Sequence, residues 1–351
     1  MRSISGPPID VRKQIILKAV VTDYVRTVEP VGSHTLMTRY EFGVKSATIR
    51  NEMAELAELG YLQQPHTSSG RIPSDLGYRF YVDRLMEDVQ LNAMEAARAR
   101  NRMHPRRSEI EIIIEQTCRI LSDLVHYTSV ATQPAVQDAV VTHISIANVG
   151  HRKMLAVVVL DNGRVLHELL EFDAGSARLD AVLATNFLLR KLSGRTLQSL
   201  NSASSDTMCE DAADMKDLLL KVLEFIKREL EPTDEVDIHM EGTSYIVQQP
   251  EFKDAYRLEA VLSALEERSA IYRLLSSAYL GPDVTVVIGS ENPVDEMQDC
   301  SFVGTKYRVN GRVAGTIGVL GPTRMDYPRA VSAVEFMAYN LGDMLTALSV
   351  E

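Results

Sequence analysis

Closely spaced helix stops in the first 73 residues constrain the fold more than any other feature of this sequence. Apolar residues recur at three- and four-residue steps over residues 10–27 and 46–59, with a short helical pattern between them. Residues that end helices close the three patterns at short intervals: Pro30, Gly43 and Gly60. Residues 61–73 then read as two extended stretches around a turn-rich cluster. Three short helices followed by a hairpin predict a winged helix-turn-helix.

The third predicted helix has one apolar face and one open face. At about 100° per residue, Ile49, Met53 and Leu56 share one narrow sector and form the core stripe. Small and polar residues fill the opposite sector, where an asparagine can pair with adenine and an arginine with guanine or phosphate. An ordinary solvent-exposed helix fits the same pattern. The candidate DNA-binding residues of this helix are Ser46, Ala47, Thr48, Arg50 and Asn51.

Small and basic side chains surround the glycine turn of the predicted hairpin. Hydroxyl, imidazole and guanidinium groups are suited to contacts with phosphates or with the minor groove. A hairpin that merely faces solvent is the alternative. The candidate DNA-binding residues of the hairpin are His66, Thr67, Ser68, Ser69 and Arg71.

Charge is distributed unequally along the chain. The 351 residues carry a net charge of −11, which taken as a whole argues against a nucleic-acid partner. Residues 1–107, however, hold 16 Lys and Arg against 12 Asp and Glu, so that this segment is at +4 and the remainder at −15. Residues 91–108 form a basic linker that could add attraction to phosphates, although a solvated connector helix is the favoured interpretation. The asymmetry indicates a nucleic-acid module on an acidic body.

Composition and spacing give no sign of a metal, cofactor, catalytic or membrane site. Cys118, Cys209 and Cys300 stand far apart, without the spacing of a disulfide framework or a metal clip. Apolar runs are far shorter than the roughly 20 residues of a membrane span, and residues 6–8 are Gly-Pro-Pro where a signal peptide would be apolar. The glycine-rich residues 315–321 suggest a nucleotide loop but lack its spacing and its lysine. We therefore predict a cytoplasmic, non-enzymatic protein.

The rest of the chain predicts an α+β multidomain protein. Helices are expected at 109–126, 256–279 and 328–348, and strands at 141–149, 153–160, 165–172, 284–288, 301–309 and 313–320. Asp-Asn-Gly at 161–163 and Asn-Gly at 310–311 are typical hairpin turns. Residues 174–250 are helical by pattern. We expect one central antiparallel sheet flanked by helices and interrupted by this helical insert.

One helical pattern in the insert predicts a contact between two copies of the chain. Its apolar face is too wide for a lone surface helix and is flanked by acidic residues. We therefore expect a homodimer held together through Leu218, Leu219, Val222, Phe225 and Ile226.

Several motifs occur in an order that resembles one known family. They are Val44-Lys45-Ser46-Ala47-Thr48-Ile49-Arg50-Asn51-Glu52-Met53, Leu59-Gly60-Tyr61-Leu62, His66-Thr67-Ser68-Ser69-Gly70-Arg71-Ile72-Pro73, Gly242-Thr243-Ser244, Gln249-Pro250-Glu251-Phe252, Ile288-Gly289-Ser290-Glu291-Asn292 and Gly318-Val319-Leu320-Gly321-Pro322-Thr323-Arg324-Met325-Asp326-Tyr327. Together they resemble the HrcA family of bacterial heat-inducible transcription repressors, over nearly the whole chain.

The resemblance implies a domain plan and a function. It implies a winged-helix domain, which we place at 1–90, a GAF-like α/β sheet domain at 109–173 and 251–351, and an inserted dimerisation region at 174–250. It also implies a dimeric transcription repressor that binds double-stranded DNA at the inverted-repeat CIRCE operator of chaperone operons. The repressor would release this operator on heat stress, and its activity would be modulated by the GroE chaperonin. The alternative is a ligand-sensing regulator or an enzyme body with an accessory winged helix.

Overall fold

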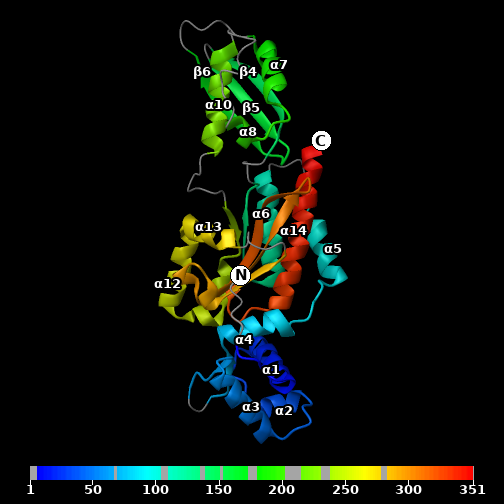
Figure 1. Ribbon diagram of the computed structural model, residues 1–351, viewed down its shortest axis with the longest axis vertical. Helices are drawn as coiled ribbons and strands as arrows, with labels where there is room; N and C mark the ends of the chain where they lie inside the picture. The colour runs from blue at the N-terminus through cyan, green and yellow to red at the C-terminus, as the bar shows by residue number, and fades with distance from the viewer. Residues whose placement is uncertain are drawn as a thin grey trace.

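Helices and sheets form several units arranged along one long axis. The computed structural model describes residues 6–66, 69–103, 110–134, 139–150, 153–172, 180–201, 215–230, 238–277 and 283–350. An N-terminal helical unit lies at one end, a body of helices and sheet in the middle, and a second helix-and-sheet unit at the far end (Figure 1). The mixed multidomain class predicted from the sequence is confirmed.

The N-terminal unit contains three helices followed by a two-stranded hairpin. These are α1 (Val11–Thr27), α2 (Ser33–Arg39), α3 (Ser46–Glu58), β1 (Leu62–Gln63) and β2 (Ile72–Pro73), with the two strands antiparallel. The Asp10 side chain caps α1 by accepting a hydrogen bond of 2.9 Å from the Lys13 amide. Ile49, Met53 and Leu56 are buried, so the predicted core stripe of the third helix is confirmed.

A backbone bridge fixes the hairpin against the connection between α1 and α2. Val31 and Arg71 exchange two backbone hydrogen bonds, each 2.9 Å long. A Cβ atom on Gly70 would lie 2.4 Å from the carbonyl oxygen of Val31, closer than real Cβ atoms approach. Only glycine therefore allows the hairpin to come this close.

A buried carboxylate ties α2 to α1. Asp23 of α1 is 1% exposed and accepts hydrogen bonds from Arg39 at 2.8 Å and from Arg26 at 3.2 Å. The Tyr40 hydroxyl donates a third bond at 3.3 Å. Because Arg39 and Tyr40 lie at the end of α2, this carboxylate holds α2 at a fixed place on α1.

Replacing Asp23 by alanine is expected to lower the free energy of unfolding by about 2–3 kcal/mol, below the roughly 3–5 kcal/mol typical when one partner of a fully buried ion pair is removed. The cost is reduced because Arg26 and Arg39 remain partly in water. Urea unfolding followed by circular dichroism would measure the change. Glu115→Ala, which removes an exposed ion pair of α6 (Ile110–Val125) with Arg119, should cost under about 1 kcal/mol. Equal effects of the two substitutions would contradict this role of Asp23.

The body is built on a five-stranded antiparallel sheet. Its strands, in spatial order, are β7 (Ile238–Glu241), β3 (Thr128–Thr132), β10 (Arg312–Pro322), β9 (Cys300–Val309) and β8 (Thr285–Ile288). One face packs against α6 and α14 (Tyr327–Val350), and the other against α12 (Ala255–Glu266) and α13 (Arg268–Ser277), as Figure 1 shows. The shorter α11 (Ser244–Gln248) follows β7.

The glycine-rich residues 315–321 lie inside strand β10. A Cβ on Gly318 would lie 2.5 Å from the Phe302 ring, and a Cβ on Gly315 would lie 2.6 Å from the Tyr307 hydroxyl. These glycines therefore make room for aromatic rings of the neighbouring strand. Their spacing reflects packing within the sheet.

The expectation of a single central sheet is wrong. β4 (Val141–Gly150), β5 (Lys153–Leu160) and β6 (Val165–Glu171) form a separate antiparallel sheet. The helices that cover it are α7 (Ala181–Leu192), α8 (Leu197–Asn201) and α10 (Lys216–Leu230), and together they enclose a separate core. The inserted unit therefore spans residues 139–230 rather than 174–250, and β7 and α11 belong to the body. Alternation predicted these strands correctly, but it does not specify which helices cover them.

The predicted dimer residues lie in this core. Leu218, Leu219, Val222, Phe225 and Ile226 are all at most 2% exposed and pack against the sheet of their own chain. Their burial needs no second copy of the protein. The wide apolar face of α10 is thus explained within one chain, and these five residues are not available for a contact between two copies.

Two segments connect the N-terminal unit to the body. The first is α4 (Asp75–Phe80), capped by the Ser74 side chain and continued by a π-helical turn at Tyr81–Leu85. The second is α5 (Ala93–Arg102), which occupies most of the predicted basic linker. Most residues of α5 are exposed, as expected for a solvated connector helix, but one side of it packs on the body, where Ala99 is buried and Arg102 pairs with Asp123 at 2.8 Å. Residues 104–109 lie outside the described residues.

Candidate nucleic-acid interface

One face of α3 is open to solvent and carries the residues selected from the sequence. Ala47, Arg50 and Asn51 are exposed, and Thr48 is half-buried. Ser46, the first residue of the helix, is half-buried, and its hydroxyl lies 3.3 Å from that of Ser33 at the start of α2. The five helix residues therefore lie at the N-terminal end of α3, three of them exposed on one surface and two half-buried at its edge.

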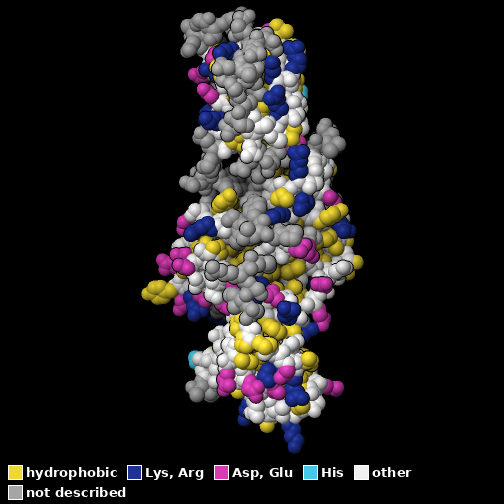
Figure 2. All heavy atoms as spheres, viewed as in Figure 1, with side chains coloured by type: hydrophobic (Ala, Val, Ile, Leu, Met, Phe, Trp, Pro, Cys, Tyr) yellow, Lys and Arg dark blue, Asp and Glu magenta, His cyan; other side chains and the backbone are white. Residues whose placement is uncertain are grey.

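Two acidic residues of the same helix pair with cations of α1. The Lys13 ammonium lies 2.8 Å from Glu52 and 2.9 Å from Glu55, and Arg12 lies 3.5 Å from Glu52. Hydrogen bonds to Glu52, Glu55 and Asp10 raise the pKa of Lys13 above its ordinary value, so this lysine stays charged. Figure 2 shows basic and acidic side chains side by side on the N-terminal unit. The repulsion that these carboxylates would exert on a polyanion is thereby reduced.

The two side chains best suited to reading bases remain free for a ligand. Within the part of the chain that the structure describes, neither the Arg50 guanidinium nor the Asn51 amide makes a hydrogen bond or an ion pair. An exposed guanidinium and an exposed amide one residue apart offer donors and acceptors to both base edges and phosphates.

The hairpin lies next to α3, because only residues 59–61 separate α3 from β1 and the two elements are in contact. The His66 side chain is exposed. The Ser69 hydroxyl donates a hydrogen bond of 2.6 Å to the His66 carbonyl and accepts one of 3.0 Å from the His66 amide. Ser69 is therefore used to shape the loop. The half-buried Arg71 is held by its backbone bridge to Val31. Thr67 and Ser68 lie outside the described residues.

Sequence reasoning missed Lys45 and Lys13 as residues that shape this surface, and it treated Gly70 only as a turn residue. Lys45 is exposed and immediately precedes α3, where its ammonium can reach a phosphate beside the helix. Gly70 allows the close approach of the hairpin to Val31, and Lys13 pairs with Glu52 and Glu55 of α3. A basic residue before a predicted helix and a glycine in a predicted hairpin turn were available signals, but the Lys13 contacts join segments about 40 residues apart.

Other chemically distinctive groups are used in packing. Burial raises the pKa of the Cys118 and Cys300 thiols to about 12, so neither is a ready nucleophile at neutral pH. Cys209 lies outside the described residues. Across the described ranges, no cluster of three or more His, Cys, Asp or Glu side chains is placed to hold a metal ion. No helix in those ranges combines the length and apolar character of a membrane span.

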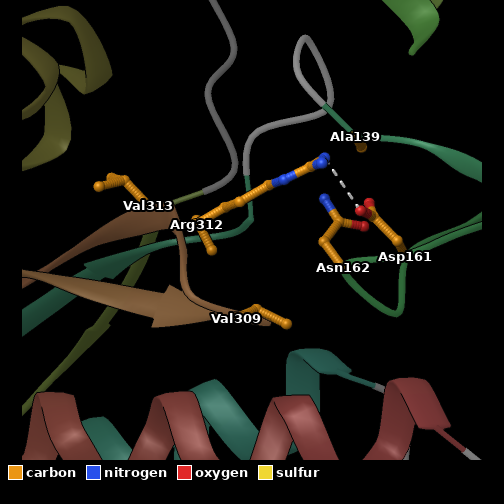
Figure 3. A pocket seen from close by; sticks show the side chains of 7 residues that line it. Ala139, Asp161, Asn162, Val309, Arg312 and Val313 are labelled. Carbon is orange, nitrogen blue, oxygen red and sulfur yellow. Dashed lines mark hydrogen bonds and ion pairs between the residues drawn. The ribbon is translucent and has the colours of Figure 1, made fainter. Parts of the chain in front are cut away.

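A small hollow lies where the inserted unit meets the body. Asp161 and Asn162 of the β5–β6 turn face Val309 and Arg312 of the β9–β10 hairpin, and Arg312 reaches Asp161 at 3.3 Å (Figure 3). Its volume is about 30 Å³, room for about one or two water molecules. The two hairpin turns therefore form a structural joint.

A three-helix unit with an open, partly basic helix face and a neighbouring hairpin, carried on an acidic body, is typical of non-enzymatic transcriptional regulators. Residues 111–331 match a family model described as the HrcA protein C terminal domain. The chain belongs to the HrcA family of heat-inducible transcription repressors.

Relatives match over almost the full length. The chain is 39% identical to a heat-inducible transcription repressor HrcA of Symbiobacterium thermophilum over 96% of this chain and 98% of the relative. It is 37% identical to the HrcA of Desulforamulus reducens over 96% and 97%. A crystal structure of a protein described as hypothetical shares the fold, with a TM-score of 0.65 at 20% identity over 97% of this chain and all of that one.

Proposed function

We propose that the chain represses transcription by binding, as a homodimer, to an inverted repeat in double-stranded DNA. The N-terminal unit acts as a winged helix-turn-helix, with α3 in the major groove and the hairpin on the DNA backbone. Thr48, Arg50 and Asn51 meet the base edges, while Arg71 and the hairpin grip phosphates. The observation that supports the proposal is that Arg50 and Asn51 are exposed on α3 and make no hydrogen bond or ion pair with any described residue, while Glu52 and Glu55 of the same helix pair with Lys13 of α1.

The family supplies the biological setting of this proposal. The relatives are named heat-inducible, and the resemblance implies the CIRCE operator of chaperone operons and modulation by the GroE chaperonin. A heat-released repressor must be marginally stable, so that a small temperature rise removes the active form. A composition of 14 Met and no Trp is consistent with adaptable packing. We assign the five-stranded sheet with its two helical layers to a GAF-like domain that has a structural role.

The dimer contact is proposed on the outer face of the β4–β5–β6 sheet. One face of this sheet is covered by α7 and α10. The other presents Leu155, Val157 and Val159 of β5, whose partners on β4 and β6 are partly apolar and partly polar, with His167 between Val165 and Leu169. Cross-strand partners include Leu155 with Leu169 and Val159 with Val165. Leu169, inside strand β6, is 45% exposed, and Val165, the first residue of the same strand, is 55% exposed. An open apolar sheet face is a typical site of association.

Operator binding is expected to decay across the heat-shock range and to recover when GroE chaperonin and ATP are added, because chaperonin returns unfolded protein to the active form. Gel shifts of an inverted-repeat duplex at rising temperature, with and without chaperonin, would measure it beside a thermal unfolding curve. Binding without any added small molecule would separate this function from that of a ligand sensor. Binding that persists far above the growth range and ignores chaperonin would contradict the heat mechanism.

A further inference from the structure

Three body segments that carry family motifs meet at the attachment of the N-terminal unit. They contain Glu291, Arg324 and Glu251, which are separated by up to 73 residues in the sequence. None of them contacts the open face of α3. Their contacts show what the motifs do in the fold.

The first contact is between α4 and the segment after β8. The Arg79 guanidinium donates to Glu291 from Nε at 2.7 Å and from Nη2, so the pair is held at two points. Nη2 also donates to the Val286 carbonyl at 2.7 Å. Arg79 and Glu291 are 12% and 20% exposed, which limits screening by salt. A two-point arginine–carboxylate pair fixes direction as well as distance.

The second contact reaches α1, a helix of the N-terminal unit itself. Arg324 donates to Glu251 from Nε at 2.6 Å and to Gln249 from Nη2 at 3.0 Å. Its remaining Nη1 donates 2.8 Å to the carbonyl of Val25 near the end of α1. Arg324 and Glu251 are 12% and 18% exposed. A residue of the body thus holds the C-terminal end of α1, although α1 and Arg324 are about 300 residues apart.

Close packing surrounds the first contact. The Asp75 carboxylate accepts 2.9 Å from the Ser290 amide, and a Cβ on Gly289 would lie 2.4 Å from that carboxylate. The rings of Tyr78 and Tyr327, both almost fully buried, pack with centroids 5.9 Å apart. One continuous apolar core runs from the N-terminal unit into the body. Two attachments on separate helices prevent the rotation that a single attachment would allow.

We propose that Glu291 and Arg324, with their partners Arg79 and Glu251, are positioning residues that fix the angle of the DNA-binding unit on the body. The inference rests on the proposed function, because a fixed angle matters when two units must meet two half-sites at one separation. Linked binding gains affinity only when the geometry lets both sites be engaged together. These residues therefore set the operator spacing that the dimer accepts, without touching DNA.

The test compares full-length wild type with Glu291→Gln and with the Glu251→Gln, Glu291→Gln double variant. Each substitution keeps the side-chain shape and removes the charge. Affinities are measured for a single half-site, for the inverted repeat, and for repeats with the spacer changed one base pair at a time. The matched control is Glu241→Gln, which removes the 3.2 Å pair with Arg119 inside the body. Arg79→Lys keeps the charge but loses the two-point geometry.

The expected result is an unchanged half-site affinity with a loss of about tenfold or more on the best inverted repeat, as linkage weakens. The dependence on spacer length should flatten in the double variant, Arg79→Lys should be intermediate, and Glu241→Gln should match wild type. An unchanged spacing profile would overturn the proposal. So would equal losses on half-site and inverted repeat, which would assign these residues to stability alone. Wild-type protein that binds single and paired half-sites equally would instead refute the proposed function.

Discussion

Replacing Asn51 by alanine is expected to weaken operator binding by about 1–3 kcal/mol, or about 5- to 150-fold, and to relax sequence preference at one base pair. The amide is exposed on α3 and is engaged by no residue within the described part of the chain. It can therefore form two hydrogen bonds to one adenine without first breaking a contact in the protein. Alanine at this position keeps the helix, since alanine is the strongest helix former.

Two comparisons make the Asn51 result specific. Arg71→Ala should weaken all DNA sequences alike, because a phosphate contact carries no base information. Asn101→Ala removes another exposed asparagine, from α5 outside the N-terminal unit, and should leave binding unchanged. Affinities for the operator, for operators changed at single base pairs and for random DNA would be measured at one fixed salt concentration. Small, equal losses on operator and random DNA in the Asn51 variant would refute base reading by this side chain.

The N-terminal unit could be predicted because its signals are local. Residues three and four apart specify the buried stripe of α3, and Gly60 ends the third helical pattern directly after that helix. The hairpin turns were also visible, since Gly163, Asn310 and Gly311 adopt positive φ angles that Asn and Gly tolerate best. In each case neighbours within a few residues decide the structure.

The division into sheets and the contacts between units could not be predicted, because they depend on distant segments. Alternation along β5 shows which side chains are buried, but it does not show whether α10 or α6 covers them. Because the sequence does not show that α10 covers this sheet, its apolar face was interpreted as a contact between two copies of the chain. Arg79 and Glu291 are ordinary charged residues in the sequence, and only the fold places them together across 212 positions.

An acidic residue on the outer face of the inserted sheet is expected to separate the dimer. Leu169→Asp places a carboxylate among the cross-strand partners of β5 and β6, where a dimer contact would have to desolvate it. The fold of one chain should tolerate the change, because Leu169 is already 45% exposed. Sedimentation should show a monomer, and operator affinity should fall by about 10²- to 10⁴-fold as binding of two linked half-sites is lost.

Leu183→Asp provides a matched control for the dimer prediction. Leu183 is 61% exposed on α7, which packs against the opposite face of the same sheet. The control should remain a dimer with wild-type operator affinity, since a surface substitution away from an interface usually changes stability by less than about 0.5 kcal/mol. If the Leu183→Asp variant dissociates while the Leu169→Asp variant remains a dimer, the dimer contact lies on α7 instead. If both variants stay dimeric, the inserted unit does not hold the two copies together, and the spacing of the DNA-binding units must be set by the body.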